Sequence, residues 1–473
     1  REDGSVDHNV FAYSNRRGSE RALVLYNNSY SSVTGRIHTA APYAEKGSDG
    51  QKHVVQRSLA EGLALESGPH RFLVFREQRS GLQYIRESDA IRRDGLFVQL
   101  RGYESQVLLD LYEVHDEHGL YRRVFEHLDG RGSYDIERLK KELYLRPAHN
   151  ALAELLREEH VAVIARVTGQ DAAAGSTEAP GAFGAAAEVS GTTGPSGAAA
   201  GASGGADTSG AAGAAGTTGA AADSGVPNHL SENERSEWRQ RYERFLEACL
   251  ELGYGKTGNK QTTLELFDHY LEGLNRLHGD TEPYYRRGLE MMPEVPAVLL
   301  GWVILAPLRE FPGKDGPYSG AAAFAEDTLL PEQFFPLLRN HGVGESSVSA
   351  LYTLLLALSD LDPLLDGAAP SNTGAKTEET KSGEAPSAED GAHAHSPLIL
   401  EKIVREPYIS RHLQVNRHLD VEWFRGEAFQ EITWWVNTLT KIVSEKKVFP
   451  HAYRWLRAEE KAEYRLQTLL EKA

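Results

Sequence analysis

The pattern of hydrophobic positions changes character once along the chain. Residues 6–116 hold short runs rich in Val, Leu, Phe and Tyr, separated by turn signals such as Arg17-Gly18-Ser19 and Asp94-Gly95, which is typical of β-strands. The predicted strands are Val10–Tyr13, Ala22–Tyr26, Arg36–Thr39, Arg71–Arg76, Leu82–Arg86, Leu96–Leu100 and Val107–Val114. Short strands in this number, without long helices between them, predict an antiparallel β-sandwich over residues 1–118.

Two of these strands are apolar on consecutive residues, Phe72-Leu73-Val74-Phe75 and Val107-Leu108-Leu109. A strand with one solvent-exposed face alternates apolar and polar residues. These continuous apolar runs therefore predict that both faces of the sheet are covered. One cover is the facing sheet, and the other is either a missing catalytic domain or the helices after Tyr121. The alternative is that the runs reflect strand ends and local bulges.

Helical spacing replaces the strand pattern from Tyr121 onward, and residues 119–170 are predicted to be helical. After residue 227, Ser231 and Glu234 form a capping box, and an apolar stripe follows on one helix face. The stripe consists of Trp238, Tyr242, Phe245 and Cys249; further predicted helices are Glu265–Leu277, Val348–Leu358, Phe424–Ile442 and Tyr453–Leu470. Helical domains are therefore predicted over 228–366 and 397–473, packed together.

Two segments have too few apolar residues to form a core. Residues 171–227 are almost entirely Ala, Gly, Ser and Thr, and residues 367–396 are similar with Glu and Lys added. Such compositions cannot offset the entropy of ordering the chain, so both segments are predicted to be disordered linkers. The expected fold class is α+β, an antiparallel β-sandwich followed by a mainly α-helical region with two low-complexity linkers.

Charge and cysteine content restrict the class of partner and the compartment. The net charge is −17, which argues against a nucleic-acid or membrane partner because both require a basic surface. Val295–Leu308 is too short for a membrane span and predicts a buried core helix. The single Cys249 excludes an internal disulfide and favours a cytoplasmic protein. No targeting signal precedes the first predicted strand, so we expect that the natural N-terminus, with any such signal, is missing.

Three motifs could carry ligand chemistry, and in each the plainer interpretation is favoured. Gly255-Lys256-Thr257 resembles the end of a phosphate-binding loop, but it follows a helix, which predicts a helix C-cap at Gly253 and Gly255. His393 and His395 lie in low complexity without other metal ligands. Trp434-Trp435, with Trp423 and Trp455, could stack on sugars, but their helical spacing favours a core.

Catalytic carboxylates are not evident. The pairs Glu158-Glu159 and Glu459-Glu460 are adjacent on predicted helices and so point in different directions, while Glu378-Glu379 lies in low complexity. The sequence therefore predicts no catalytic, cofactor-binding or metal-binding residue and no cofactor.

The segment Val10 to Asn28 resembles the start of the C-terminal sandwich of the α-amylase family of glycoside hydrolases (glycoside hydrolase family 13). In that domain a strand rich in Phe or Tyr and Arg is followed by a turn and a strand of the type Val-Leu-Val-x-x-Asn. Leu96 to Asp110 resembles the closing strands of the same domain. The resemblance covers about a quarter of the chain.

Family members are retaining glycosidases on a (β/α)₈ barrel that carries a nucleophilic Asp, an acid/base Glu and a second Asp that holds the sugar in its distorted state. Neither Asp223 to His229 nor Val114-His115-Asp116 reproduces a barrel motif, so no catalytic residue is carried over. The resemblance implies a non-catalytic C-terminal portion whose partner is a barrel upstream of Arg1, and the isolated chain is expected to be inactive. The alternatives are an interaction or scaffold protein and a carbohydrate-binding module.

Overall fold

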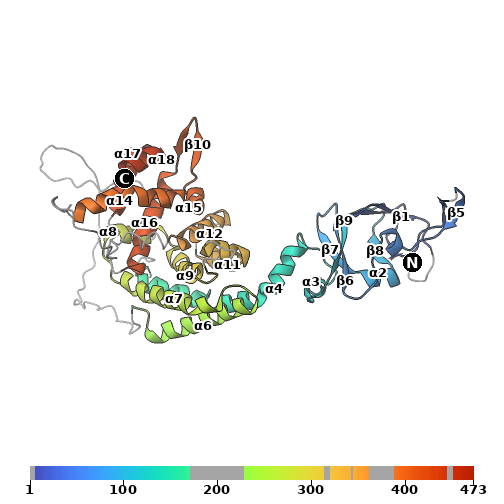
Figure 1. The fold of residues 1–473 in the computed structure, drawn as a ribbon, viewed down its shortest axis with the longest axis horizontal. Helices are drawn as coiled ribbons and strands as arrows, with labels where there is room; N and C mark the ends of the chain where they lie inside the picture. Colours follow the sequence, from blue (N-terminus) through green and yellow to red (C-terminus); the bar gives the residue numbers. More distant parts are fainter. Residues whose placement is uncertain are drawn as a thin grey trace, which may run out of the picture. The chain divides into compact units, whose positions relative to one another are not determined.

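The computed structural model describes residues 6–48, 50–170, 228–313, 320–341, 345–361, 388–444 and 451–473. The chain divides into two compact units, Arg1–Ala148 and His149–Ala473. The first contains antiparallel sheet and the second is mainly helical (Figure 1), which confirms the predicted α+β class. The predicted linker at 171–227 lies outside the described residues.

The sheet unit is built on five antiparallel strands in the order β1-β2-β9-β6-β7. Two antiparallel ribbons, β3–β8 and β4–β5, accompany this sheet. The strands are β1 (Val10–Arg17), β2 (Glu20–Asn27), β3 (Val33–Ile37), β4 (Tyr43–Lys46), β5 (Lys52–Val55), β6 (Arg71–Glu77), β7 (Gln83–Glu87), β8 (Leu96–Leu100) and β9 (Ser105–His115). All seven predicted strands overlap a strand of the structure.

The inner face of the five-stranded sheet packs on strand β8 and on two short helices, α1 (Leu59–Gly62) and α2 (Ser88–Asp94). Leu23 and Leu25 of β2, with Leu73 of β6, are the buried centre of this layer. Ser58 and Glu61 form a capping box that starts α1.

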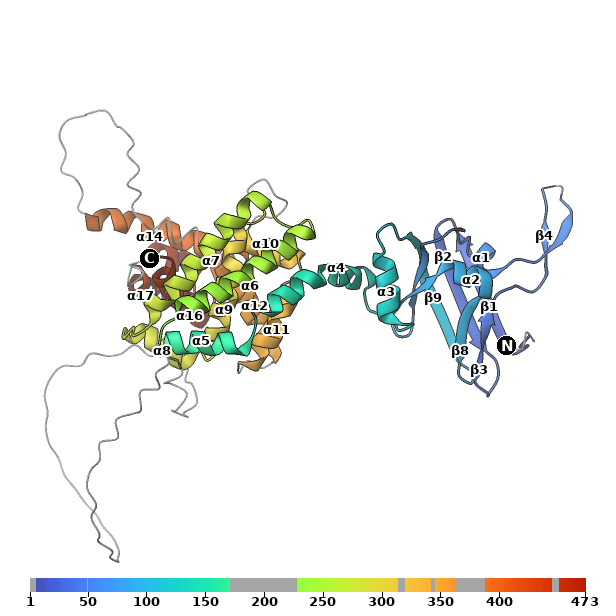
Figure 2. The same cartoon turned by 90° about the horizontal axis from the view of Figure 1, so that it is seen from below.

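The outer face of the same sheet packs on helices α3 (Leu120–Leu128) and α4 (Ile136–Ala153). Phe72, Val74 and Ile85 meet Val124 and Ile136 in a second buried cluster. Figure 2 shows α3 on the side of the sheet opposite to α1 and α2. The prediction that the apolar run at residues 72–75 is covered on both sides is confirmed, and the second cover is the helices after Tyr121.

The helical unit begins with α5 and ends with α18. Its helices are α5 (Glu158–Thr168), α6 (Glu232–Glu251), α7 (Lys260–Leu274), α8 (Pro283–Met291), α9 (Val295–Leu305), α10 (Ala321–Asp327), α11 (Pro331–Asn340), α12 (Glu345–Ser359), α14 (Ala388–Arg405), α15 (Pro407–His412), α16 (Gly426–Val443), α17 (Ala452–Ala462) and α18 (Leu466–Lys472). Strands β10 (Asn416–His418) and β11 (Val421–Trp423) form a small hairpin, and three single 3₁₀ turns lie at Thr257–Asn259, Asn275–Leu277 and Ala306–Arg309.

Helix α9 is the centre of this unit. Each of its residues is buried, and α5, α7, α10, α11 and α12 contact it. This confirms the prediction of a core helix at Val295–Leu308. Within the described residues no single helix is long and apolar enough to cross a membrane; α8 with the segment Val295–Arg309 passes by length and composition only as a pair bent by 102°.

Helix α6 begins and packs as its sequence predicts. Ser231 and Glu234 form the reciprocal capping box, and the stripe from Trp238 to Cys249 is buried. Burial raises the pKa of the Cys249 thiol to about 12, because a thiolate is poorly solvated in an apolar interior.

Two predicted boundaries are wrong. Tyr453–Leu470 is two helices, because Glu463 and Tyr464 have positive φ (50° and 62°) and turn the chain to meet β11. Helix α14 begins at Ala388, inside the predicted linker 367–396, where Ala and Glu favour helix despite the low complexity. Residues 119–170 form helices α3, α4 and α5, and the division after Ala148 places α5 with the helical unit.

Candidate functional site

Among the described residues of the first unit, no helix packs on the outer sheet face where β1 and β2 lie. Phe11 and Tyr13 of β1 stand directly opposite Tyr26 and Val24 of β2, and Val24 stands opposite Val107 of β9. Directly opposed residues share a face of the sheet, and Leu23 and Leu25, which alternate with Val24 and Tyr26, belong to the inner cluster. We call the five outer side chains Phe11, Tyr13, Val24, Tyr26 and Val107 the open face.

The open face is aromatic and partly exposed. Phe11 is 39% exposed and Tyr13 is 62% exposed, and their rings stack with centroids 6.5 Å apart. Val24, Tyr26 and Val107 are half-buried. The second outer-face cluster lies over β6 and β7, where α3 and α4 supply the cover. A contiguous apolar surface of this kind marks an interaction site more often than a lone exposed side chain does.

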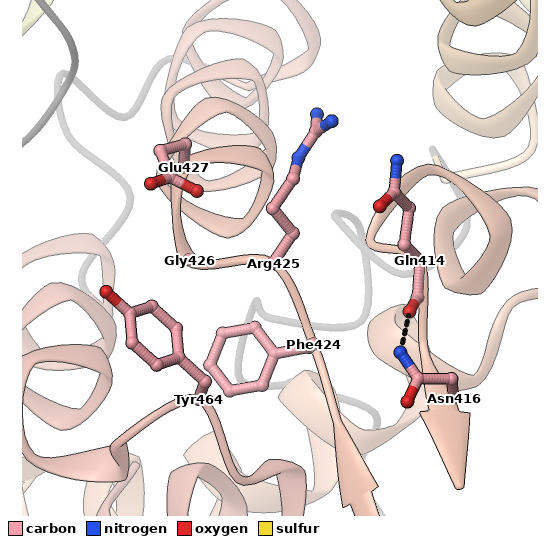
Figure 3. A pocket seen from close by; sticks show the side chains of 7 residues that line it. All are labelled: Gln414, Asn416, Phe424, Arg425, Gly426, Glu427 and Tyr464. Carbon is pink, nitrogen blue, oxygen red and sulfur yellow. Dashed lines mark hydrogen bonds between the residues drawn. The ribbon is translucent and has the colours of Figure 1, made fainter.

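The second unit has a shallow depression of about 360 Å³ at the start of α16. Figure 3 shows the rings of Phe424 and Tyr464 side by side, with the guanidinium of Arg425 directed away from them. The Phe424 N–H donates to the Tyr464 carbonyl over 3.0 Å. A side chain on Gly426 would come within 2.6 Å of a Glu459 carboxylate oxygen, so the Glu459 side chain would have to move to admit one. The lining residues include no nucleophile with an adjacent base.

Partial burial raises the pKa values of two half-buried carboxylates, Asp360 and Glu406, and the charge of Asp360 raises the pKa of Glu406 further. Asp360 accepts hydrogen bonds from the N–H groups of Ala321 and Ala322 at the start of α10, and Glu406 accepts one from the Ile409 N–H at the start of α15. Both carboxylates therefore cap helices, which explains their position without a catalytic role.

Among the described residues, Lys441 on α16 is the most deeply buried Lys, Arg, Asp or Glu, and its side chain is 3% exposed. Its ammonium lies 2.5 Å from Asp280 and 3.2 Å from Glu282, and 4.8 Å from the centre of the Tyr285 ring. The Tyr453 hydroxyl also donates to Glu282. Each charge in the group has a partner, so the cluster joins α16, α8 and α17 rather than offering a vacant binding position.

The motifs weighed in the sequence have structural roles. Gly253 and Gly255 follow α6 with φ of 83° and 86°, as the predicted C-cap requires. A side chain on Gly255 would come within 2.4 Å of the Phe311 ring, so the glycine also permits core packing. This geometry supports the helix-end interpretation and not the phosphate loop.

The tryptophans are core residues, as their spacing predicts. Trp434, Trp435 and Trp455 are fully buried, and Trp423 is half-buried beneath Arg465. A buried ring cannot stack on a sugar, so Trp434, Trp435 and Trp455 do not contribute to the aromatic platform considered as an alternative.

The remaining candidates carry surface contacts or lie outside the description. Glu158 pairs with His341 and Glu159 lies near Arg157; Glu459 accepts from Gln430. The side chains of His393 and His395 and the pair Glu378-Glu379 lie outside the described residues. Where the structure is described, no group of three or more His, Cys, Asp or Glu side chains could hold a metal ion.

Comparison with protein-family models, with curated proteins and with solved structures finds no match to this chain. The resemblance to the α-amylase family therefore stays a prediction.

Proposed function

We propose that the chain is the non-catalytic C-terminal portion of an amylase-like glycoside hydrolase or glucosyl-transferring enzyme. In this proposal the open face packs against the catalytic barrel, and the helical unit is an appended domain. The open face is the observation that carries the proposal, because an aromatic surface on a folded sheet needs a partner to remove it from water.

The position of the open face supports this partner. It is formed mainly by β1 and β2, the two strands that carry the resemblance to the amylase sandwich. The unit covers the β6–β7 half of the outer face with its own helices, so the uncovered half is the one available for another domain. Burial of a large aromatic side chain contributes about 2 kcal/mol, and the open face offers Phe11 and Tyr13 for such burial.

The decisive test is the reading frame upstream of Arg1. It is expected to encode a (β/α)₈ barrel with a Gly-x-Arg-x-Asp motif and a later Glu. That barrel, produced as a separate chain, should bind residues 1–473 in calorimetry. Phe11→Asp and Tyr13→Asp should each weaken binding at least tenfold. An upstream frame without a barrel, or a barrel whose binding ignores both substitutions, would overturn the proposal.

Tyr134→Asp is the matched control in that experiment, because Tyr134 is 83% exposed in the same unit but lies outside the open face. Its binding should equal that of the unsubstituted chain. Residues 1–473 alone are expected to leave starch, maltose and an activated aryl glucoside intact, and sustained turnover above a buffer control would contradict a non-catalytic role.

A further inference from the structure

Two turns of the sheet unit meet at one end of the strands. One is residues 28–32, between β2 and β3, and the other is residues 101–104, between β8 and β9. They lie together because β2 pairs with β9 and β3 pairs with β8, with Tyr26 opposite Ser105 and Val33 opposite Leu100. Residues about 70 positions apart in the sequence are thus brought to one site.

The wholly buried side chain of Asn27 joins the two turns. Its amide nitrogen donates to the Ser31 carbonyl over 2.8 Å and to the Arg101 carbonyl over 2.9 Å. Its oxygen accepts from the Ser29 N–H over 3.1 Å. Because one side chain satisfies groups of both turns, neither turn can shift without leaving a buried amide unpaired.

The backbone of the second turn fits against the first with no space to spare. A side chain on Gly102 would come within 2.0 Å of the Tyr30 carbonyl oxygen. Tyr103 has a φ of 56°, a conformation that is uncommon for a bulky residue, and its N–H donates to the Ser29 carbonyl over 2.9 Å. Strain that surrounding contacts hold in place is a feature of functional sites.

These backbone contacts fix two turns whose tyrosine rings are exposed to solvent. Tyr30 is 87% exposed and Tyr103 is 60% exposed, and the rings lie edge to face with centroids 6.5 Å apart. Neither hydroxyl forms a hydrogen bond within the described part of the chain. The two anchored turns therefore present a pair of aromatic side chains that makes little contact with the protein itself.

We propose that the Tyr30–Tyr103 pair is a binding site for an α-linked glucan chain. Sugars present apolar C–H faces that stack on aromatic rings and hydroxyl groups that bond to phenols and amides. The anchored backbone lowers the entropic cost of binding, because the turns are already held in place. The proposal rests on the proposed function for the choice of an α-linked sugar.

The local charge favours a neutral ligand of this kind. The turn segment Asn28-Ser29-Tyr30-Ser31-Ser32 has hydroxyl and amide groups but no charge. The second turn carries one cation, Arg101, and one anion, Glu104. The net charge of −17 further disfavours anionic ligands. Neutral polyhydroxylated chains match both the aromatic and the polar groups of the two turns.

The test is isothermal calorimetry of residues 1–473 with maltoheptaose, with cellohexaose and a decaproline peptide as comparison ligands. Tyr30→Ala and Tyr103→Asn should each weaken maltoheptaose binding about tenfold. Asn is chosen at position 103 because it tolerates positive φ. Tyr30→Phe retains the ring and should lose less affinity than Tyr30→Ala. Tyr134→Ala, an exposed tyrosine elsewhere in the unit, should change nothing.

The inference would be overturned if maltoheptaose did not bind, or if the Tyr30→Ala and Tyr103→Asn variants bound it as tightly as the unsubstituted chain. Binding of decaproline alone would also overturn it. Circular dichroism of each variant shows whether the fold is retained, and Tyr30→Phe keeps the inference testable if either of the other two is unfolded. The upstream reading frame answers a separate question: a barrel there with no glucan binding here would remove this inference and leave the proposed function intact.

Discussion

The two units place their aromatic side chains in opposite environments. All six tryptophans belong to the helical unit, and five of them are buried. The sheet unit has no tryptophan, yet it exposes Phe11, Tyr13, Tyr30 and Tyr103 as two pairs. Aromatic content alone would have directed attention to the helical unit. Exposure shows instead that the aromatic rings available to a partner gather on the sheet unit.

The largest expected effect tests whether the helical unit depends on its aromatic core. Trp434 is fully buried, stacks on Tyr285 with centroids 5.8 Å apart, and donates its Nε1–H to the Tyr285 carbonyl. Trp434→Ala should lower the free energy of unfolding of this unit by about 4 kcal/mol. Half-buried Trp423 is the matched control, and Trp423→Ala should cost about 1 kcal/mol.

Urea denaturation followed by tryptophan fluorescence measures both variants, because every tryptophan reports on the helical unit alone. An equal loss of unfolding free energy in the two variants would show that the contribution of these tryptophans to stability does not depend on their burial.

A second effect tests the buried charges of the helical unit. Lys441→Met removes the cation between Asp280 and Glu282, so that two half-buried carboxylates face each other without it. The free energy of unfolding should fall by about 3 kcal/mol. Lys402 is exposed on α14 and is the matched control. Lys402→Met should change the free energy of unfolding by less than about 0.5 kcal/mol. A Lys441→Met protein as stable as the unsubstituted one would show that the pairs contribute no net stability.

A smaller effect concerns pH. Burial lowers the pKa of His160, and the positive charge of Arg241 lowers it further. The Arg241 guanidinium donates to Nε2 over 2.8 Å and Nδ1 donates to the Leu155 carbonyl, which together require the neutral imidazole. Since the folded-state pKa lies below the unfolded value, this contribution is complete above the unfolded pKa of about 6.5 and is lost as pH falls below it.

Urea midpoints at pH 7.5 and 5.5 measure this contribution. The helical unit should be less stable at the lower pH, and His160→Gln should reduce the difference because glutamine does not titrate. Glu159 and Arg157 also lie near His160, so Glu159→Gln separates their influence from that of the ring. An unchanged pH dependence in His160→Gln would contradict the assignment.

The smallest effect is expected in the sheet unit. Tyr30 is almost wholly exposed, so Tyr30→Ala should alter the free energy of unfolding by less than about 0.5 kcal/mol. Far-ultraviolet circular dichroism during urea denaturation measures it. A loss above about 1 kcal/mol would show that Tyr30 stabilises the fold, and the contrast between the two units would then be weaker than the exposures indicate.

Local sequence signals predicted most of the elements. The strand at Leu96–Leu100 has the bounds that alternation predicts, and Ser231 starts α6 because its capping box is complete within four residues. The ribbon β4–β5 was missed because its strands are short and mostly exposed, so they carry little hydrophobic pattern. The break at Glu463 was missed because it depends on pairing with β11 and not on Gly or Pro.

The candidate sites could be predicted only in part. The core position of Trp434 follows from helical spacing within one segment. Tyr30 and Tyr103 could not be paired from the sequence, because their proximity depends on the pairing of distant strands and on the hydrogen bonds of Asn27. A tyrosine flanked by Asn and Ser in a turn is a weak signal. The open face likewise depends on which half of the sheet α3 and α4 cover.

The burial of Cys249 has a practical consequence for chemical labelling. Maleimides and iodoacetamides react with the thiolate form of cysteine. Cys249 is buried on α6 with a pKa of about 12, so almost none of it is thiolate at neutral pH. A cysteine introduced at Tyr30 or Tyr13 would therefore be the one thiol that reacts while the protein is folded. Fluorophores or spin labels can thus be attached at either aromatic pair without first replacing the native cysteine.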